Sequence, residues 1–172
     1  MPENLIVRPA TDADIDATVE IETVADALLI DLFGAVDWPP PADADERRLS
    51  PGFVLVAEHS DGTGNAQVVG FVQVLDLGGH AHLEQLSVLP SHGRRGIGRL
   101  LVDAALVEAR RRGHESITLR TYADVPWNAP FYASCGFVES TPETDLLRSL
   151  IEVERSLGLL AHGRRVQMTA AL

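Results

Sequence analysis

The sequence predicts an α/β (α+β) protein in which helices flank a mixed, mostly antiparallel sheet of six or seven strands. Three observations support this class. Short apolar segments alternate with turn residues, as in 53–77. Two longer segments, 12–33 and 97–112, carry apolar residues at helical spacing. No repeat and no linker divides the chain, so we expect a single domain over residues 1–172.

Turn residues and periodicity place the individual elements. The first strand ends at Pro9, a helix capped by Thr11 or Asp12 runs to Phe33, and the proline-rich, acidic stretch 34–48 is expected to be a loop. Further strands are expected at 53–59, 67–77, 80–89, 116–123, 136–140 and 164–172. Further helices are expected at 97–112, 127–135 and 142–163. The turns at 60–65 and 77–79 are short, so the second, third and fourth strands should pair antiparallel.

Charge and cysteine content narrow the classes of function. The net charge is −11, and all fourteen basic residues are arginine. Residues 1–92 hold 3 Arg against 16 Asp and Glu, whereas residues 93–172 hold 11 Arg against 9. An acidic half disfavours nucleic acid and favours cationic small molecules, although solubility alone would also explain it. With one cysteine, no secretory pattern and no apolar run of membrane length, we expect a soluble, cytoplasmic protein without membrane contact.

The segment 86–106, LSVLPSHGRRGIGRLLVDAAL, carries the strongest chemical signal. Between the end of a strand and the start of a helix stand Gly93, Arg94, Arg95, Gly96, Ile97, Gly98 and Arg99. Free N–H groups at a helix N-terminus attract phosphates, glycines permit close approach, and arginines add charge. The alternative is an ordinary glycine-rich turn. The absence of lysine excludes a Walker loop, and Leu101 stands where a dinucleotide fingerprint needs a small residue.

This segment resembles the acetyl-CoA loop of the GNAT superfamily of N-acetyltransferases, whose pattern is Q/R-x-x-G-x-G/A. Gly96 and Gly98 match the glycines, whereas Gly93 departs from the Gln or Arg of the pattern and lacks a side-chain contact. The segment 132–137, YASCGF, resembles the superfamily's Y-x-x-x-GF segment. The strand order is also similar. The resemblance implies a GNAT-like fold with an extra C-terminal helical insertion at 141–162, where the family more often has a tight turn.

The resemblance further implies that acetyl-CoA is the acyl donor. In the family the fourth strand splays from the fifth and the pantetheine arm inserts between them. The strand segment Leu86, Ser87 and Val88 would then pair with the arm, and an N–H near Val88 would meet the thioester oxygen. Tyr132 would be the general acid for the departing thiolate, or else a packing aromatic. Asn128 would either contact the cofactor or only cap its helix.

Three polar residues at alternate positions, His80, His82 and Glu84, are expected on one face of a strand. The pattern resembles the fourth strand of the arylalkylamine N-acetyltransferases, where two histidines occupy the positions of His82 and Glu84. A His82–Glu84 pair could take the proton of an acceptor ammonium. The alternatives are an ordinary solvated strand and a metal site, and we expect no metal.

The acceptor is expected between the first helix and the fourth strand, where the family's corresponding loop lines the pocket. Trp38 with Asp37, Asp43 and Asp45 could receive an amine through cation–π and charge contacts, and the alternative is a solvated proline-rich loop. We assign Trp38, Asp37 and His80 to acceptor binding. The predicted reaction is acetyl transfer from acetyl-CoA to an amine of a small, cationic molecule or a peptide N-terminus by direct attack in a ternary complex. The alternative from another class is a non-catalytic acyl-CoA-binding sensor. The sequence does not decide between a monomer and a homodimer.

Overall fold

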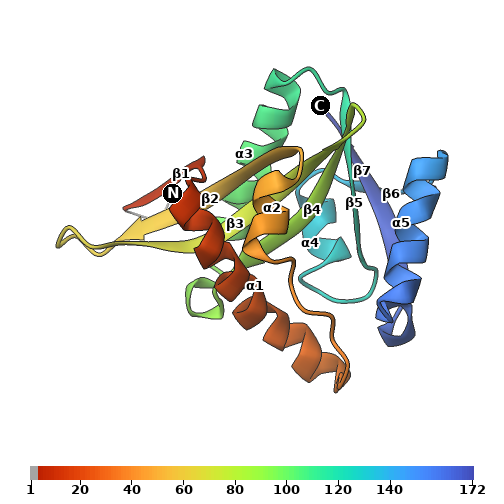
Figure 1. Cartoon of the computed structure of the whole chain (residues 1–172), viewed down its shortest axis with the longest axis horizontal. Coiled ribbons are helices and arrows are strands. Elements are labelled where there is room, and N and C mark those ends of the chain that lie inside the picture. Colours follow the sequence, from red (N-terminus) through yellow and green to blue (C-terminus); the bar gives the residue numbers. More distant parts are fainter. Residues whose placement is uncertain (1–3) are drawn as a thin grey trace.

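The computed structural model describes residues 4–172 and contains a seven-stranded sheet in the order β1-β2-β3-β4-β5-β7-β6 (Figure 1). Neighbouring strands are antiparallel except β4 and β5, which are parallel. The strands are β1 (Leu5–Pro9), β2 (Gly52–Ser60), β3 (Ala66–Leu77), β4 (His80–Val88), β5 (Ser116–Tyr122), β6 (Val138–Ser140) and β7 (Arg165–Ala171). The helices are α1 (Asp12–Phe33), α2 (Ala44–Leu49), α3 (Ile97–Arg111), α4 (Ala129–Ser134) and α5 (Asp145–Ser156), with 3₁₀ turns η1 (Pro90–His92) and η2 (Leu159–His162). The predicted α+β class and mostly antiparallel sheet are confirmed.

Helix α1 has the bounds that its terminal residues predict. At its start, the Asp14 carboxylate accepts a hydrogen bond from the backbone N–H of Thr11 at 2.7 Å, which satisfies a group that the helix leaves free. At its end, Gly34 takes a left-handed conformation with φ of +59°. Its buried residues Ile15 and Ile21 face the sheet, and the helix packs across β3 and β4.

The expectation of a loop over 34–48 is wrong at its C-terminal end, where α2 forms. The Asp43 carboxylate accepts a hydrogen bond from the N–H of Glu46 at 2.9 Å and so caps this short helix. Arg47 is buried because its guanidinium donates to Thr18 on α1 and to Gln73 on β3. These tertiary hydrogen bonds hold α2 in place. The loop prolines all precede α2, so they do not interrupt the helix.

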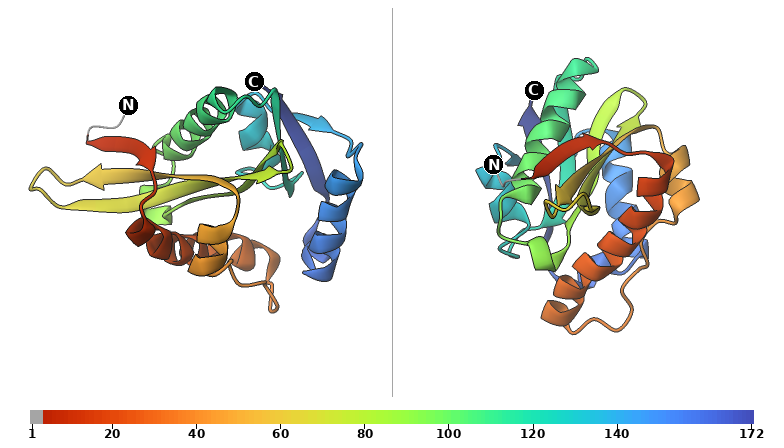
Figure 2. Two further views of the ribbon diagram at one scale, coloured as in Figure 1. Left: turned by 45° about the horizontal axis from the view of Figure 1, so that its top comes forward. Right: turned by 90° about the vertical axis from the view of Figure 1, so that its left-hand side faces the viewer.

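The two faces of the sheet differ in chemistry. Helix α3 covers one face, where Leu101, Val102 and Ala105 pack against apolar strand residues in the main core. The opposite face is covered by α1 over the N-terminal strands and by α5 over the C-terminal strands, as the left view of Figure 2 shows. No helix among residues 4–172 is long and apolar enough to cross a membrane.

The sheet divides between β4 and β5. Only three residue pairs join these strands, and the last is Leu83 with Leu119. Beyond this point β4 contains a bulge, because Gln73 and Val74 of β3 pair with Gln85 and Leu83 and leave Glu84 without a partner. A bulge bends a strand and re-aims its side chains. The two strands therefore diverge from Glu84 onward.

Candidate active site

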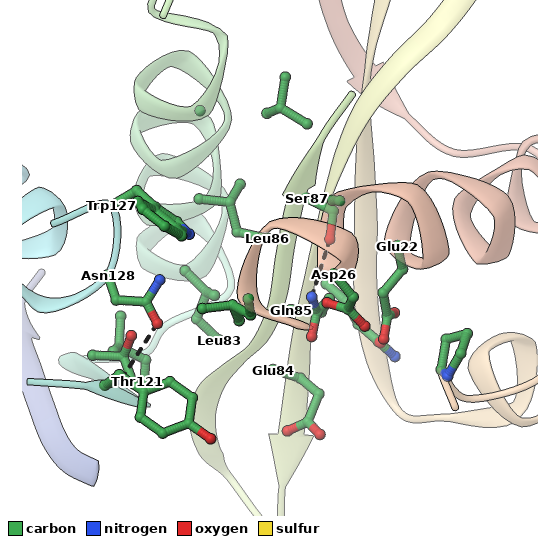
Figure 3. Close-up of a pocket in the computed structure, with 18 of the residues that line it drawn as sticks. Glu22, Asp26, Leu83, Glu84, Gln85, Leu86, Ser87, Thr121, Trp127 and Asn128 are labelled. Atoms are coloured by element: carbon green, nitrogen blue, oxygen red, sulfur yellow. Dashed lines mark hydrogen bonds between the residues drawn. The ribbon is translucent and has the colours of Figure 1, made fainter. Parts of the chain in front are cut away.

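A cavity of about 1560 Å³ opens where β4 and β5 diverge. Figure 3 shows Glu22 and Asp26 of α1 on one side, Trp127 and Asn128 on the other, and Glu84 of β4 between them. Most of the residues assigned from the sequence line it: Trp38, His82, Glu84, Leu86, Ser87, Val88, Gly93, Arg94, Gly96, Ile97, Gly98, Arg99, Asn128 and Tyr132.

Three assigned residues lie outside this lining. Arg95 is exposed, and so is Asp37 beside Trp38. His80 lies at the start of β4, where its Nε2 lies 2.8 Å from the Thr118 hydroxyl. The structure therefore brings neither Asp37 nor His80 to the acceptor cavity.

The segment Gly93–Arg99 forms one end of the cavity. Gly96 precedes α3 with a positive φ of +78°, and Arg94 also has a positive φ, of +59°. Helix geometry leaves the first N–H groups of α3 free to bind an anion. Arg99 is instead held by α4, since its guanidinium donates to the Ser134 carbonyl at 2.8 Å.

The polar groups of β4 form a chain that ends in the cavity. The Thr118 hydroxyl lies 2.9 Å from Nδ1 of His82 and also contacts His80. One hydroxyl hydrogen can serve only one of the two rings, so the other ring must donate to Thr118. Nε2 of His82 lies 3.7 Å from the Glu84 carboxylate, a distance that one water molecule could bridge. His82 is buried, whereas the Glu84 side chain is 48% exposed and borders the cavity.

Desolvation shifts the two pKa values in opposite directions, because His82 is buried and Glu84, although its side chain is half exposed, lies within the cavity. Burial, with smaller contributions from His80 and Arg120, lowers the pKa of His82 to about 4, so the ring is neutral at pH 7. Desolvation, aided by the nearby charge of Glu22, raises the pKa of Glu84 above its ordinary value. Within residues 4–172 no three His, Cys, Asp or Glu side chains are grouped as a metal site requires.

Tyr132 and Asn128 lie across the cavity from β4. The Tyr132 ring contacts Phe131 and Phe137 edge-on, and burial raises the pKa of its hydroxyl, which therefore keeps its proton at neutral pH. Asn128 makes no capping hydrogen bond to its helix. Its Oδ1 accepts from the N–H of Tyr122 at 3.4 Å instead, so the capping alternative is not what the structure shows.

Residues 21–137 match the acetyltransferase (GNAT) family. The chain belongs to this family. It is a GNAT-family N-acetyltransferase, as the resemblance of its loop and its Y-x-x-x-GF segment implies. The match ends at Phe137, the last residue of that segment.

Solved structures share the fold along nearly the whole chain. Rv2747 from Mycobacterium tuberculosis, solved with CoA and NLQ, is 23% identical with a TM-score of 0.66, covering 97% of this chain and 99% of that one. The ribosomal-protein-S18-alanine N-acetyltransferase from Escherichia coli is 20% identical with a TM-score of 0.67, covering 97% and 93%. YncA from Salmonella typhimurium, solved with its cofactor acetyl-CoA, is 22% identical with a TM-score of 0.66, covering 99% and 95%.

The α1 side of this acetyltransferase cavity carries carboxylates that the sequence reasoning missed. Glu22 forms an ion pair with the buried Arg47. Asp26 accepts a hydrogen bond from the indole N–H of Trp38 at 3.3 Å. Burial, together with the charge of Glu22, raises the pKa of Asp26 to about 6. The two acidic residues are four positions apart, a spacing that places them on one helix face and could have identified them.

An aromatic cluster joins the end of α1 and the loop after it to β5 and η2, beside the cavity. Phe33 stacks on His162 with ring centroids 5.2 Å apart, and Trp38 lies 5.7 Å from the same imidazole. Tyr122 of β5 packs against Phe33 at 4.9 Å. The η2 turn is thereby attached to α1 and to the loop that follows it.

The raised pKa of Asp26 gives a stability prediction. The unfolded carboxyl ionises near 3.8 and the folded one near 6, so the stability from keeping Asp26 neutral is lost as pH rises through about 6. Asp26→Asn should therefore stabilise the protein at pH 7.5 by on the order of 1 kcal/mol and change it little below pH 4. Urea unfolding at both pH values measures this, with the exposed Asp31→Asn as control. Equal effects at the two pH values would contradict the assignment.

Proposed function

We propose that this enzyme transfers the acetyl group of acetyl-CoA to an amine of a small, cationic molecule or a peptide N-terminus, by direct attack in a ternary complex. The observation that carries the proposal is the continuity of one cavity from the Gly93–Arg99 loop, past the divergence of β4 and β5, to the carboxylates of α1. A donor and an acceptor can enter such a cavity from opposite ends and meet beside Glu84.

The donor end has the groups that acetyl-CoA requires. The first N–H groups of α3 and Arg94 suit the pyrophosphate. The N–H of Leu89 already donates to Val69 of β3 at 2.8 Å. Because successive residues of a strand direct their N–H groups to opposite edges, the N–H of Val88 faces the open side. It is then placed to pair with the pantetheine arm or to stabilise the thioester oxyanion.

We assign Glu84 as the general base and His82 as its positioning partner. A base must accept a proton near the working pH, and a buried imidazole with a pKa of about 4 is poorly matched to this task. Glu84 has a raised pKa and is accessible from the cavity. Neutral His82 can hold a water molecule against the carboxylate and pass the proton on.

Tyr132 is the proposed general acid. Its side chain lines the cavity, and its hydroxyl is protonated at neutral pH and makes no hydrogen bond within the described residues. The hydroxyl proton is therefore available to the departing CoA thiolate. We also propose that residues 141–162 are an addition to the fold common in the family. Helix α5, which lies within this addition, would close the end of the cavity that receives the acceptor.

Acetyl-CoA binding tests the donor site. Gly96→Val should abolish binding measured by calorimetry, because a β-branched residue is strained at a φ of +78° and would distort the loop. Gly113→Val is the matched control, since Gly113 has a φ of +92° but lies at the far end of α3. Both variants should lose stability, and only Gly96→Val should lose binding. Wild-type protein that binds no acetyl-CoA would refute the proposed function.

The pH dependence of kcat/KM tests the base. Only ionised Glu84 can accept a proton, so wild-type kcat/KM should rise as pH rises through a pKa above the ordinary value of 4.5. Glu84→Gln should remove this rise and lower the rate by roughly 10²–10⁴. His82→Ala should cost less, and the double variant less than the sum of the two in free energy. Exposed Glu20→Gln is the control, and a wild-type profile in Glu84→Gln would exclude Glu84 as the base.

The acid has a separate test. Tyr132→Phe keeps the ring packing but removes the hydroxyl, so acetyl-CoA affinity should stay near normal while kcat falls roughly 10²–10⁴. Steady-state kinetics by thiol release, with calorimetry on the same variant, separate the two quantities. An unchanged kcat would mean that Tyr132 only packs. Acetyl-CoA binding without turnover of any amine would instead favour the sensor alternative.

A further inference from the structure

A second group of charged residues lines the cavity away from α1. Arg120 on β5 and Arg165 on β7 both donate to one carboxylate oxygen of Glu154 on α5, at 2.9 and 2.8 Å. All three side chains are buried, with 7%, 13% and 7% of their surfaces exposed. Sequence reasoning missed this group, because topology alone brings its three elements together.

The group carries excess positive charge and unused donors. Burial alone would raise the pKa of Glu154, but the hydrogen bonds from Arg165 and Arg120 hold it below its ordinary value, so Glu154 is ionised. One negative charge then faces two positive charges. Arg165 Nε and the second carboxylate oxygen of Glu154 are both buried without a partner within residues 4–172. Arg165 is already paired with Glu154 and lies over the Tyr122 ring, 4.5 Å from its centroid. A guanidinium has five N–H donors, however, and a buried donor without a partner is costly unless something completes its contacts.

The position of Arg120 relates this group to the reacting centre. In the parallel register, His82 pairs with Thr118 and Leu83 with Leu119. Glu84 and Arg120 are the next residues along each strand, on the face that His82 and Thr118 share. Both residues directly follow the last pair of the two strands, so they stand where the strands begin to diverge, and both line the same cavity. One small molecule in this cavity can therefore place an ammonium at Glu84 and an anion at Arg120.

We propose that Arg120 and Arg165 bind a carboxylate of the acceptor, and that the acceptor is a free amino acid whose amine is directed to Glu84. The inference rests on the proposed function, since Glu84 is the base there, and it replaces the cation or peptide N-terminus of that proposal with a zwitterion that carries both an ammonium and a carboxylate. Planar guanidinium groups suit carboxylates because they can donate two parallel hydrogen bonds. A diamine has no group for the arginines, and its second ammonium would be repelled by them.

The experiment compares acceptors that differ only in the carboxylate. Wild-type enzyme with acetyl-CoA is assayed by thiol release against the L-amino acids other than cysteine, whose own thiol would react in the assay, and against their C-terminal amides, putrescine and a tetrapeptide amide. The best amino acid should exceed its own amide in kcat/KM by at least about tenfold, the value of a charge-assisted hydrogen bond. Arg120→Gln should bring this acid-to-amide ratio close to one, and Arg120→Lys should restore part of it.

Arg164→Gln is the matched control, because Arg164 precedes β7, is exposed, and pairs with Glu139 outside the cavity. It should keep the wild-type ratio. A purely structural role for Arg120 predicts equal losses for acid and amide, which would overturn the proposal. The proposal would also be overturned if the enzyme preferred an amide, putrescine or the tetrapeptide amide, or if it acetylated no amino acid. Either result would leave the proposed acetyl transfer to amines intact. Absence of acetyl-CoA binding in wild type by calorimetry would remove both.

Discussion

The site depends on how briefly β4 pairs with β5. Three residue pairs hold the two halves of the sheet together, and the bulge at Glu84 then bends β4 away. Buried backbone groups need partners, so two central strands that separate leave N–H and C=O groups for water or a ligand to satisfy. The orientation of Leu89 toward β3 directs the N–H of Val88 into this opening. The same divergence supplies the cavity volume and presents Glu84 to it.

Charge in the cavity is arranged around Glu84. On the α1 side, Glu22 and Asp26 outnumber Arg47, whereas on the α5 side Arg120 and Arg165 outnumber Glu154. Both groups are desolvated, which strengthens their interaction with a charged ligand and costs folding free energy when no ligand is bound. The raised pKa of Asp26 and the unpartnered Nε of Arg165 are two signs of that cost. Such groups are typical of binding sites rather than of a structural core.

Local signals in the sequence were sufficient for most of the fold. Capping at Thr11 and Gly34 set the bounds of α1, and short turns set the antiparallel order of β2, β3 and β4. Helix α2 was missed because its stability comes from contacts of Arg47 with distant residues. The glycines and Glu84 were found because each motif is contiguous. Arg120, Glu154 and Arg165 were not, since they meet only through the adjacency of β5 and β7 and the placement of α5.

Hydrogen–deuterium exchange with and without acetyl-CoA tests the central claim most directly, namely that the donor occupies the opening between β4 and β5. Exchange of backbone amides should slow at Leu86 and Val88 and in the 93–99 loop, because these N–H groups gain partners, whereas the N–H of Ser87 faces β3. Exchange should stay unchanged in the turn at 77–80, which lies at the opposite end of β3 and β4 from Val88. Protection that spared 86–88 while acetyl-CoA bound elsewhere would contradict the account.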